Sequence, residues 1–404
     1  MARFLKSRIL VLTSIAHYIN DGAAIAYATV YPLYVYMGYS YTDISIASAL
    51  YLGTSSITSL FVGKIGDRVE RPFILLAIGM ILWSLAIAIL GLSISLIGTS
   101  IAYPLLIAST IVGGIASSIY HPIGAGILSH HFTEDRGLAL GINGAMGALG
   151  RSSYPVIITL LLTTTHIGLF PLAVISLLSS IPMIALARIA TKIIDMKSST
   201  GSIPREVYMP IALLTIIAMA RGIVSQGALT YLAIMVTQKL GIAYGVEVGL
   251  LTSLAMVGSI MSQPLLGVIS DRLGRRNTML LTTLMASLSL YGFIEFYRYQ
   301  IALYLSLFLF GVSAFEAFTL LLAFVSDTVP QRYINTANSI VWGIGISAGG
   351  SMGPVIVGLI ASHSSLDTGY VVIALINLLT IPVIYIASRY AVTEYNRPGF
   401  HNHR

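Results

Sequence analysis

A short polar loop between two long apolar runs occurs twice in this chain, and this repeat constrains the fold more than any other feature. The first copy occupies residues 63–72 and the second residues 267–276, 204 positions further along a chain of 404 residues. Both copies follow the pattern Gly-x-x-x-Asp-Arg-x-x-Arg. Glycine permits a tight turn, and aspartate can pair with a neighbouring helix terminus. The spacing, about half of the chain, predicts two copies of one structural unit.

The composition indicates where such a chain resides. Hydrophobic residues make up 56% of the chain and charged residues only 9%, with a mean hydropathy of +0.88. A soluble domain carries about 25% charged residues, so we predict a polytopic membrane protein. The net charge of +7 then reflects basic loops rather than a nucleic-acid partner. Cysteine is absent, which excludes disulfides and thiolate metal sites.

Twelve apolar runs reach the length of ~20 residues that a membrane-spanning helix needs. The expected spans are Ile9–Tyr36, Thr42–Val62, Phe73–Ile97, Ser100–Ser129, Gly137–Thr165, Gly168–Ala190, Tyr208–Thr237, Val246–Leu266, Thr278–Tyr297, Gln300–Ser326, Asn335–Ala361 and Thr368–Arg389. We therefore predict an all-α membrane protein of two pseudo-symmetric six-helix bundles. The first bundle covers residues 1–190, a polar linker residues 191–207, and the second bundle residues 208–404 with a short tail.

The basic residues predict the orientation of the chain in the membrane. Of the 22 Lys and Arg residues, eighteen fall on one side of the expected spans, Lys239 and Arg298 fall on the other, and two lie inside spans. Because cytoplasmic loops carry the excess of Lys and Arg, we expect both termini, the linker and both polar loops to be cytoplasmic, in the cell membrane.

The two six-span halves, the linker and the repeated loop resemble the major facilitator superfamily of secondary transporters. The second loop matches the loop of that family through Gly274, Arg275 and Arg276. In the first, Glu70 and Pro72 stand where glycine and a basic residue are usual. The resemblance implies alternating access, with the solute held near the membrane midplane between the halves.

Two further stretches are similar to the fosmidomycin-resistance branch of efflux proteins in this superfamily. These are His-Tyr-Ile-Asn-Asp-Gly at residues 17–22 and Tyr-His-Pro at residues 120–122. The fifth span, with glycines at 141, 144, 147 and 150, resembles the glycine-rich helix of superfamily antiporters, although Arg151 stands where those antiporters have proline. The resemblance favours efflux.

Ionisable groups inside the spans are costly in a bilayer and are therefore candidate functional residues. His17 and Asp21 are four residues apart and share one face of the first span. We predict that Asp21 carries a proton, with His17, His121 and Glu316 as further candidates; the alternative is that Asp21 caps a helix break or pairs permanently with an arginine. For His121, a structural bond to a carbonyl freed by Pro122 is an equal alternative. For Glu316, we favour pairing with Arg221.

Arg151 and Arg221, one in each half, cannot lose their charge and need a carboxylate or an anionic ligand. If both pair with acids the solute can be neutral, whereas a free arginine selects an anion; we favour an anionic solute. The predicted solute-binding residues are Arg151, Arg221, Asn143, Tyr154, Asn338 and Trp342. For Trp342, packing is the stronger alternative.

The sequence predicts a proton-coupled secondary transporter of a small organic anion, by efflux antiport or, alternatively, by uptake symport of an organic acid. We expect a monomer in the bilayer, with no cofactor and no metal, and no nucleotide loop occurs. A membrane enzyme or lipid flippase is the remaining alternative. We expect the loops to close the cytoplasmic side through contacts between the halves. Their residues are Gly63, Asp67, Arg68, Arg71, Gly267, Asp271, Arg272 and Arg275.

Overall fold

The computed structural model describes residues 2–66, 68–189, 205–315, 317–330 and 333–390. Over these residues the chain is helical and contains no strand, which confirms the all-α prediction. The first half comprises α1 (Ala2–Tyr36), α2 (Tyr41–Gly66), α3 (Pro72–Ser95), α4 (Ala102–His131), α5 (Arg136–Thr164) and α6 (Phe170–Ala187). Each of these six helices matches one expected span.

The second half is more interrupted. It comprises α7 (Arg205–Leu240), α8 (Val246–Leu273), α9 (Arg275–Phe296), α10 (Gln300–Ala314), α11 (Ala317–Thr328), α12 (Ile334–Ile340), the π-helix η2 (Val341–Ile346), α13 (Ser347–His363), α14 (Leu366–Leu378) and α15 (Thr380–Ser388). Ten helices in the described ranges are long and apolar enough to cross a membrane, and α8, bent by 50°, makes eleven. The expected tenth span corresponds to the shorter α10 followed by α11.

Two spans of the second half depart from a continuous α-helix. In the eleventh, α12 and α13 are joined by η2, whose Gly345 approaches the backbone of α7 so closely that a Cβ there would lie 2.9 Å from the carbonyl oxygen of Thr215. A π-helical turn inserted in an α-helix is frequent at functional sites. In the twelfth, Pro382 has no N–H for the carbonyl of Leu378, where α14 ends.

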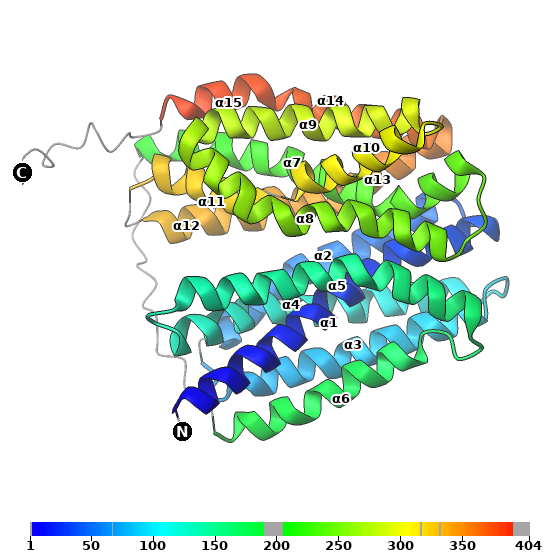
Figure 1. The fold of residues 1–404 in the computed structure, drawn as a ribbon, viewed down its shortest axis with the longest axis horizontal. Helices are drawn as coiled ribbons and strands as arrows, with labels where there is room; N and C mark the ends of the chain where they lie inside the picture. Colours follow the sequence, from blue (N-terminus) through cyan, green and yellow to red (C-terminus); the bar gives the residue numbers. More distant parts are fainter. Residues whose placement is uncertain (1, 67, 190–204, 316, 331–332, 391–404) are drawn as a thin grey trace, which may run out of the picture.

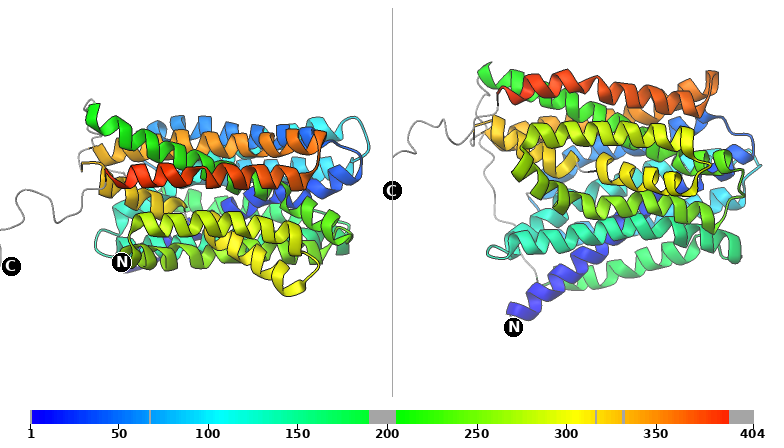
Figure 2. Two further views of the ribbon diagram at one scale, coloured as in Figure 1. Left: turned by 90° about the horizontal axis from the view of Figure 1, so that it is seen from above. Right: turned by 45° about the horizontal axis from the view of Figure 1, so that its top comes forward.

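The helices form two bundles that lie side by side (Figure 1), with α1 and α3–α6 in one and α7–α15 in the other. Helix α2 lies between them and packs against α13. The start of α1, the end of α15 and the start of α7 lie at one end of the molecule (Figures 1 and 2), which we call the terminal end. The opposite end, where α1 ends and α2 begins, is called the far end.

Hydrogen bonds join the two bundles at the far end. The hydroxyls of Thr42 and Ser362 lie 2.9 Å apart, and those of Ser48 and Thr230 also 2.9 Å. Tyr231 donates to the carbonyl of Tyr41. These hydrogen bonds between the halves all involve the first turns of α2. At the terminal end, in contrast, a Cβ added to Gly137, Gly141 or Gly144 of α5 would meet nothing within 4 Å.

Candidate functional site

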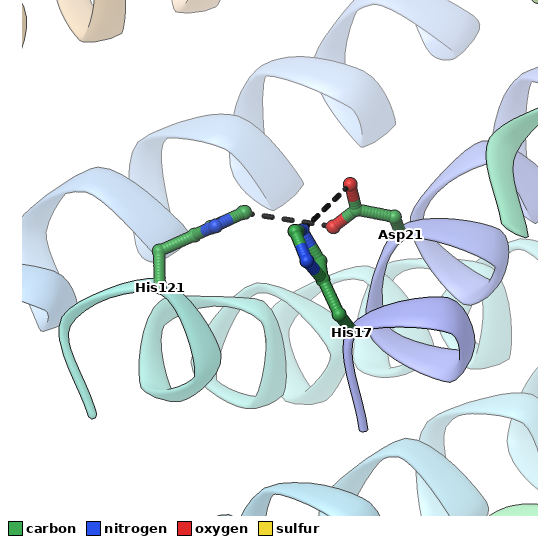
Figure 3. Close-up of side chains that lie close together, drawn as sticks. All are labelled: His17, Asp21 and His121. Atoms are coloured by element: carbon green, nitrogen blue, oxygen red, sulfur yellow. Dashed lines mark ion pairs between the residues drawn. The ribbon is translucent and has the colours of Figure 1, made fainter. Parts of the chain in front are cut away.

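Asp21 lies near the middle of α1, and its carboxylate is the centre of a polar cluster inside the first half. Its side chain is 4% exposed. The carboxylate Oδ2 lies 3.3 Å from Nε2 of His17, and Oδ1 lies 3.6 Å from Nε2 of His121 on α4. Figure 3 shows the two imidazoles and the carboxylate converging on one point. A carboxylate buried at this depth requires such partners to remain charged.

Arg151 on α5 completes the cluster, because its guanidinium donates to Oδ2 of Asp21 and forms an ion pair with it. The pairing of Arg151 with Asp21, left open by the sequence, is therefore present. The arginine side chain is 24% exposed, so it lies at the edge of the buried cluster. Its Nε is buried and has no acceptor among the described residues.

The hydrogen bonds of His17 determine which of its nitrogens carries a proton. Nδ1 lies 2.8 Å from the backbone carbonyl of Asn143 and 3.0 Å from the side-chain Oδ1 of the same residue. A carbonyl oxygen only accepts, so Nδ1 carries hydrogen. In neutral His17, Nε2 then presents a lone pair towards the carboxylate of Asp21, which is repulsive. A proton shared between Nε2 and Asp21 removes that repulsion.

Three residues that the sequence analysis did not select hold these groups in place. Asn20 donates to Oδ1 of Asp21 at 3.0 Å, and the indole of Trp83 on α3 donates to Asn20 at 2.9 Å. Tyr120 stacks on the ring of His17, with 4.4 Å between centroids, and donates to Oδ1 of Asn143 at 2.7 Å. Asn20 directly precedes Asp21 and Tyr120 directly precedes His121 in the sequence. This adjacency is the sequence signal by which the two residues could have been found.

His121 is the accessible member of the cluster, with a side chain that is 62% exposed. Its ring faces Asp21 and lies 5.4 Å from that of His17. Two roles were considered from the sequence, a bond to a carbonyl freed by Pro122 and a part in the polar cluster. In the structure this imidazole lies beside the carboxylate of Asp21, which is the position that the second role requires. His121 therefore connects the buried cluster to its surroundings.

His17, Asp21 and His121 also have the residue types of a metal site, and their ligand atoms all lie within 4.8 Å of one another. Histidine nitrogens and a carboxylate suit a zinc-like ion. However, the guanidinium of Arg151 is already bonded to the same carboxylate. Its fixed positive charge opposes a divalent cation at this point. The cluster is better suited to a proton than to a metal.

Arg221 on α7 is the corresponding cation of the second half and is 4% exposed. Its guanidinium donates to the carbonyl of Met279 at 3.0 Å, and to the hydroxyls of Thr282 and Thr283 at 2.9 and 3.0 Å. These acceptors all belong to α9, so Arg221 ties α7 to α9. Its expected partner Glu316 lies outside the described residues, and that pairing stays a prediction.

The other predicted solute-binding residues differ in accessibility. Tyr154 is 1% exposed and packs edge-on against Tyr18, within the contact of α1 and α5. Asn338 on α12 and Trp342 in η2 are half-buried, and Oδ1 of Asn338 is buried with no donor among the described residues. A solute can reach the half-buried residues more readily than Tyr154 in this conformation.

In the second polar loop, Arg275 bonds to Asp271 at 2.6 Å and to Asp327 of α11 at 3.1 Å. These ion pairs lie within the second half and do not join the two halves. Arg272 forms no ion pair within the described ranges, and a Cβ added to Gly267 would meet nothing within 4 Å. In the first loop, Asp67 lies outside the described residues. Gly63 has open space around it, and Arg68 and Arg71 are exposed. The gating role of both loops stays a prediction.

Comparison with known proteins identifies the class to which this fold belongs. The Major Facilitator Superfamily model matches residues 10–193 and 211–403, so the chain is a multi-pass membrane transporter. It belongs to the Major Facilitator Superfamily, which confirms the predicted fold of two six-helix halves. Among curated proteins, no relative matches the sequence.

Solved structures of similar fold include two transporters. The nucleoside transporter NupG is 13% identical, with a TM-score of 0.76 over 96% of this chain and 99% of that one. A bacterial homologue of the human lysosomal transporter Spinster, in an inward-facing and occupied conformation, is 14% identical, with a TM-score of 0.73 over 96% of this chain and 98% of that one. At these identities the likeness concerns the fold.

Proposed function

We propose that this protein is a proton-coupled secondary transporter that moves a small anionic organic solute across the cell membrane by alternating access. The observation that carries the proposal is the cluster of His17, Asp21, His121 and Arg151 near the middle of three spans. Charged groups at this depth are retained for transport or proton relay rather than for packing.

The proton is held between His17 and Asp21. Because Nδ1 of His17 is fixed as a donor to Asn143, its Nε2 and the carboxylate, 3.3 Å apart, share one site for a proton. His121, which is exposed and faces the same carboxylate, passes protons between this site and the surrounding water. Each transport cycle loads and releases one proton here.

The solute binds beside the proton site. The buried Nε of Arg151 and Nδ2 of Asn143 are both donors without an acceptor in the described part of the chain, and both residues lie on α5. The two residues are about 12 Å apart along the helix axis, and the ring of His17 lies over Gly147 between them. Each donor suits an oxygen of an anionic group such as a carboxylate or phosphonate, so the two would bind separate oxygens of one solute.

The conformation fits one state of an alternating-access cycle. The halves are bonded at the far end through Thr42, Ser48 and Tyr231, whereas the glycines of α5 face open space at the terminal end. The excess of basic residues at the terminal end orients it to the cytoplasm. We therefore propose an inward-facing state with both termini cytoplasmic, and we expect the protein to act as a monomer.

The test is solute-driven proton movement in liposomes that hold the purified protein and an internal pH dye. Succinate, gluconate, methylphosphonate and the neutral nucleoside uridine are added in turn, and protein-free liposomes correct for leakage. We expect an anion to change the internal pH, and expect Arg151→Ala to abolish this change. Glu295→Gln, an exposed carboxylate at the end of α9, is the matched control. Absence of proton movement with every solute would overturn the proposal.

A further inference from the structure

We propose that the solute and the proton bind together, so that the protein is a symporter of an organic anion and not an antiporter. This inference rests on the proposed function and fixes the sign of its coupling. It follows from the fact that one guanidinium, that of Arg151, is the ion-pair partner of Asp21 and also the best-placed cation for the solute.

The ionised carboxylate and an anionic solute compete for Arg151. While Asp21 is ionised, the guanidinium is engaged by Oδ2, and a second anion at Arg151 would lie beside this carboxylate. Like charges this close strongly disfavour simultaneous occupancy in a site of low dielectric. A proton shared between Nε2 of His17 and Asp21 offsets the charge of this carboxylate, and so weakens both the competition for the guanidinium and the repulsion.

The charges of the whole cluster lead to the same conclusion. The charged or titratable groups against Asp21 are His17 on its own helix, His121 on α4 and Arg151 on α5. Asn20, which Trp83 of α3 holds in place, is neutral. With both imidazoles neutral, Asp21 and Arg151 sum to zero. One added proton makes the cluster cationic, and one added anion restores neutrality.

The exchange is balanced in atoms and charge. One proton from the water near His121 enters the His17–Asp21 pair, and the guanidinium turns its N–H groups from Asp21 to the solute. Nε of Arg151 and Nδ2 of Asn143, which lack acceptors in the described structure, then donate to the solute oxygens. On release, the solute and the proton depart, and the Asp21–Arg151 ion pair forms again.

An antiporter would need the opposite relationship, in which the proton displaces the solute. Here a proton adds positive charge beside the anion and therefore tightens its binding, and by linkage the anion tightens proton binding equally. The efflux direction suggested by the resemblance of residues 17–22 and 120–122 requires this anion to leave in exchange for protons. The arrangement around Asp21 instead favours uptake driven by an inward proton gradient.

Two measurements in liposomes test the sign of the coupling. The probe is whichever of succinate, gluconate and methylphosphonate gives the largest wild-type response. When it enters down its gradient, a symporter acidifies the interior and an antiporter makes it alkaline, whichever way the protein is inserted. Exchange of labelled for unlabelled probe is measured in parallel. In wild type we expect the half-saturating concentration to rise about tenfold per pH unit above the pKa of the cluster.

Asp21→Asn separates binding from coupling, because asparagine has the shape of the carboxyl group and leaves Arg151 available. We expect this variant to retain exchange within about threefold of wild type, to lose proton movement and to lose the pH dependence of binding. Glu295→Gln should resemble wild type. An alkaline interior in wild type, or loss of exchange in an Asp21→Asn protein of normal thermal stability, would overturn symport while leaving proton coupling intact. If Asp21→Asn does not fold, the direction of the internal pH change with the wild-type protein decides between symport and antiport.

Discussion

Nδ1 of His17 lies 2.8 Å from the backbone carbonyl of Asn143, and this contact determines how the centre of the protein can hold a proton. A backbone carbonyl cannot change its role from acceptor to donor, so the tautomer of His17 does not depend on any neighbouring side chain. The contact also joins α1 to α5 at the depth of Asp21. The two imidazoles thus differ, because His17 is fixed by the backbone whereas the side chain of His121 is exposed.

Removing the Asn143 side chain should weaken solute binding while leaving the proton site in place. In Asn143→Ala the carbonyl that fixes His17 remains, but the donor Nδ2 is lost. A hydrogen bond to a charged group contributes about 1.5–3 kcal/mol, so we expect the half-saturating concentration of the solute to rise roughly tenfold or more with little change in maximal rate. Initial uptake rates at several concentrations measure this.

The matched control is Tyr120→Phe, which loses the hydroxyl bonded to Oδ1 of Asn143 and keeps the ring stacked on His17. We expect the half-saturating concentration of the solute to rise less in this variant than in Asn143→Ala. An equal effect of both substitutions would show that Asn143 acts by holding its neighbours rather than by contacting the solute.

Gly147→Ala should disturb the cluster because the added methyl group would overlap the imidazole of His17. The ring is held between Tyr120 and Asn143 and cannot yield easily. Overpacking of this kind costs about 1–3 kcal/mol, so thermal stability and transport should both fall. Gly144→Ala, one turn away, would meet nothing within 4 Å and should keep its thermal stability. Equal melting temperatures of Gly147→Ala and Gly144→Ala would contradict the close contact between Gly147 and His17.

Asn20 should be required for stability as well as for transport. Asn20→Leu removes the donor to Asp21 and leaves the indole N–H of Trp83 buried without its acceptor. An unsatisfied buried donor costs about 1–3 kcal/mol. Trp83→Phe alone removes the other partner, and the double variant should be more stable than the sum of the two single effects implies. Additive losses of thermal stability would show that this bond carries no coupling.

Arg275 should contribute little to stability, although it forms two ion pairs. The carboxylates of Asp271 and Asp327 are both exposed, and solvent-exposed pairs contribute about 0–1 kcal/mol and are screened by salt. We expect Arg275→Met to lower the melting temperature slightly at low salt and not at high salt. Arg272→Met, at an exposed position without an ion pair in the described ranges, is the control. A large loss that persists in high salt would indicate a buried role.

The fold followed from the sequence because apolar run length and basic-residue bias are strong one-dimensional signals. The helix breaks in the second half could not be predicted from these signals. The π-helix η2 depends on how closely Gly345 approaches α7, and no local sequence pattern indicates that approach. Pro382 was a local signal of a helix break. Because the spans were predicted from the length of apolar runs alone, α14 and α15 were predicted as one continuous helix. Most other helix boundaries lie within a few residues of the expected spans, but α1 begins at Ala2 instead of Ile9 and α8 ends at Leu273 instead of Leu266.

The candidate site was predictable in composition but not in geometry. Asp21 and Arg151 were selected because charged residues inside spans are rare, and their pairing needed the packing of α1 on α5. The role of Asn143 could not be deduced, because it acts on His17 through a backbone carbonyl that every residue possesses. Arg221 looked equivalent to Arg151 in sequence, whereas burial against α9 distinguishes them.

Cross-linking the far end should stop transport by holding the halves in the observed conformation. The side-chain oxygens of Thr42 and Ser362, from α2 and α13, lie 2.9 Å apart, so cysteines at these positions are adjacent. The natural chain has no cysteine, which makes the pair specific. We expect Thr42→Cys/Ser362→Cys to lose transport on oxidation and regain it on reduction, with either single variant unaffected. Because alternating access requires this end to open, full activity of the oxidised, cross-linked protein would show that the contact between α2 and α13 is permanent and that the halves do not separate there.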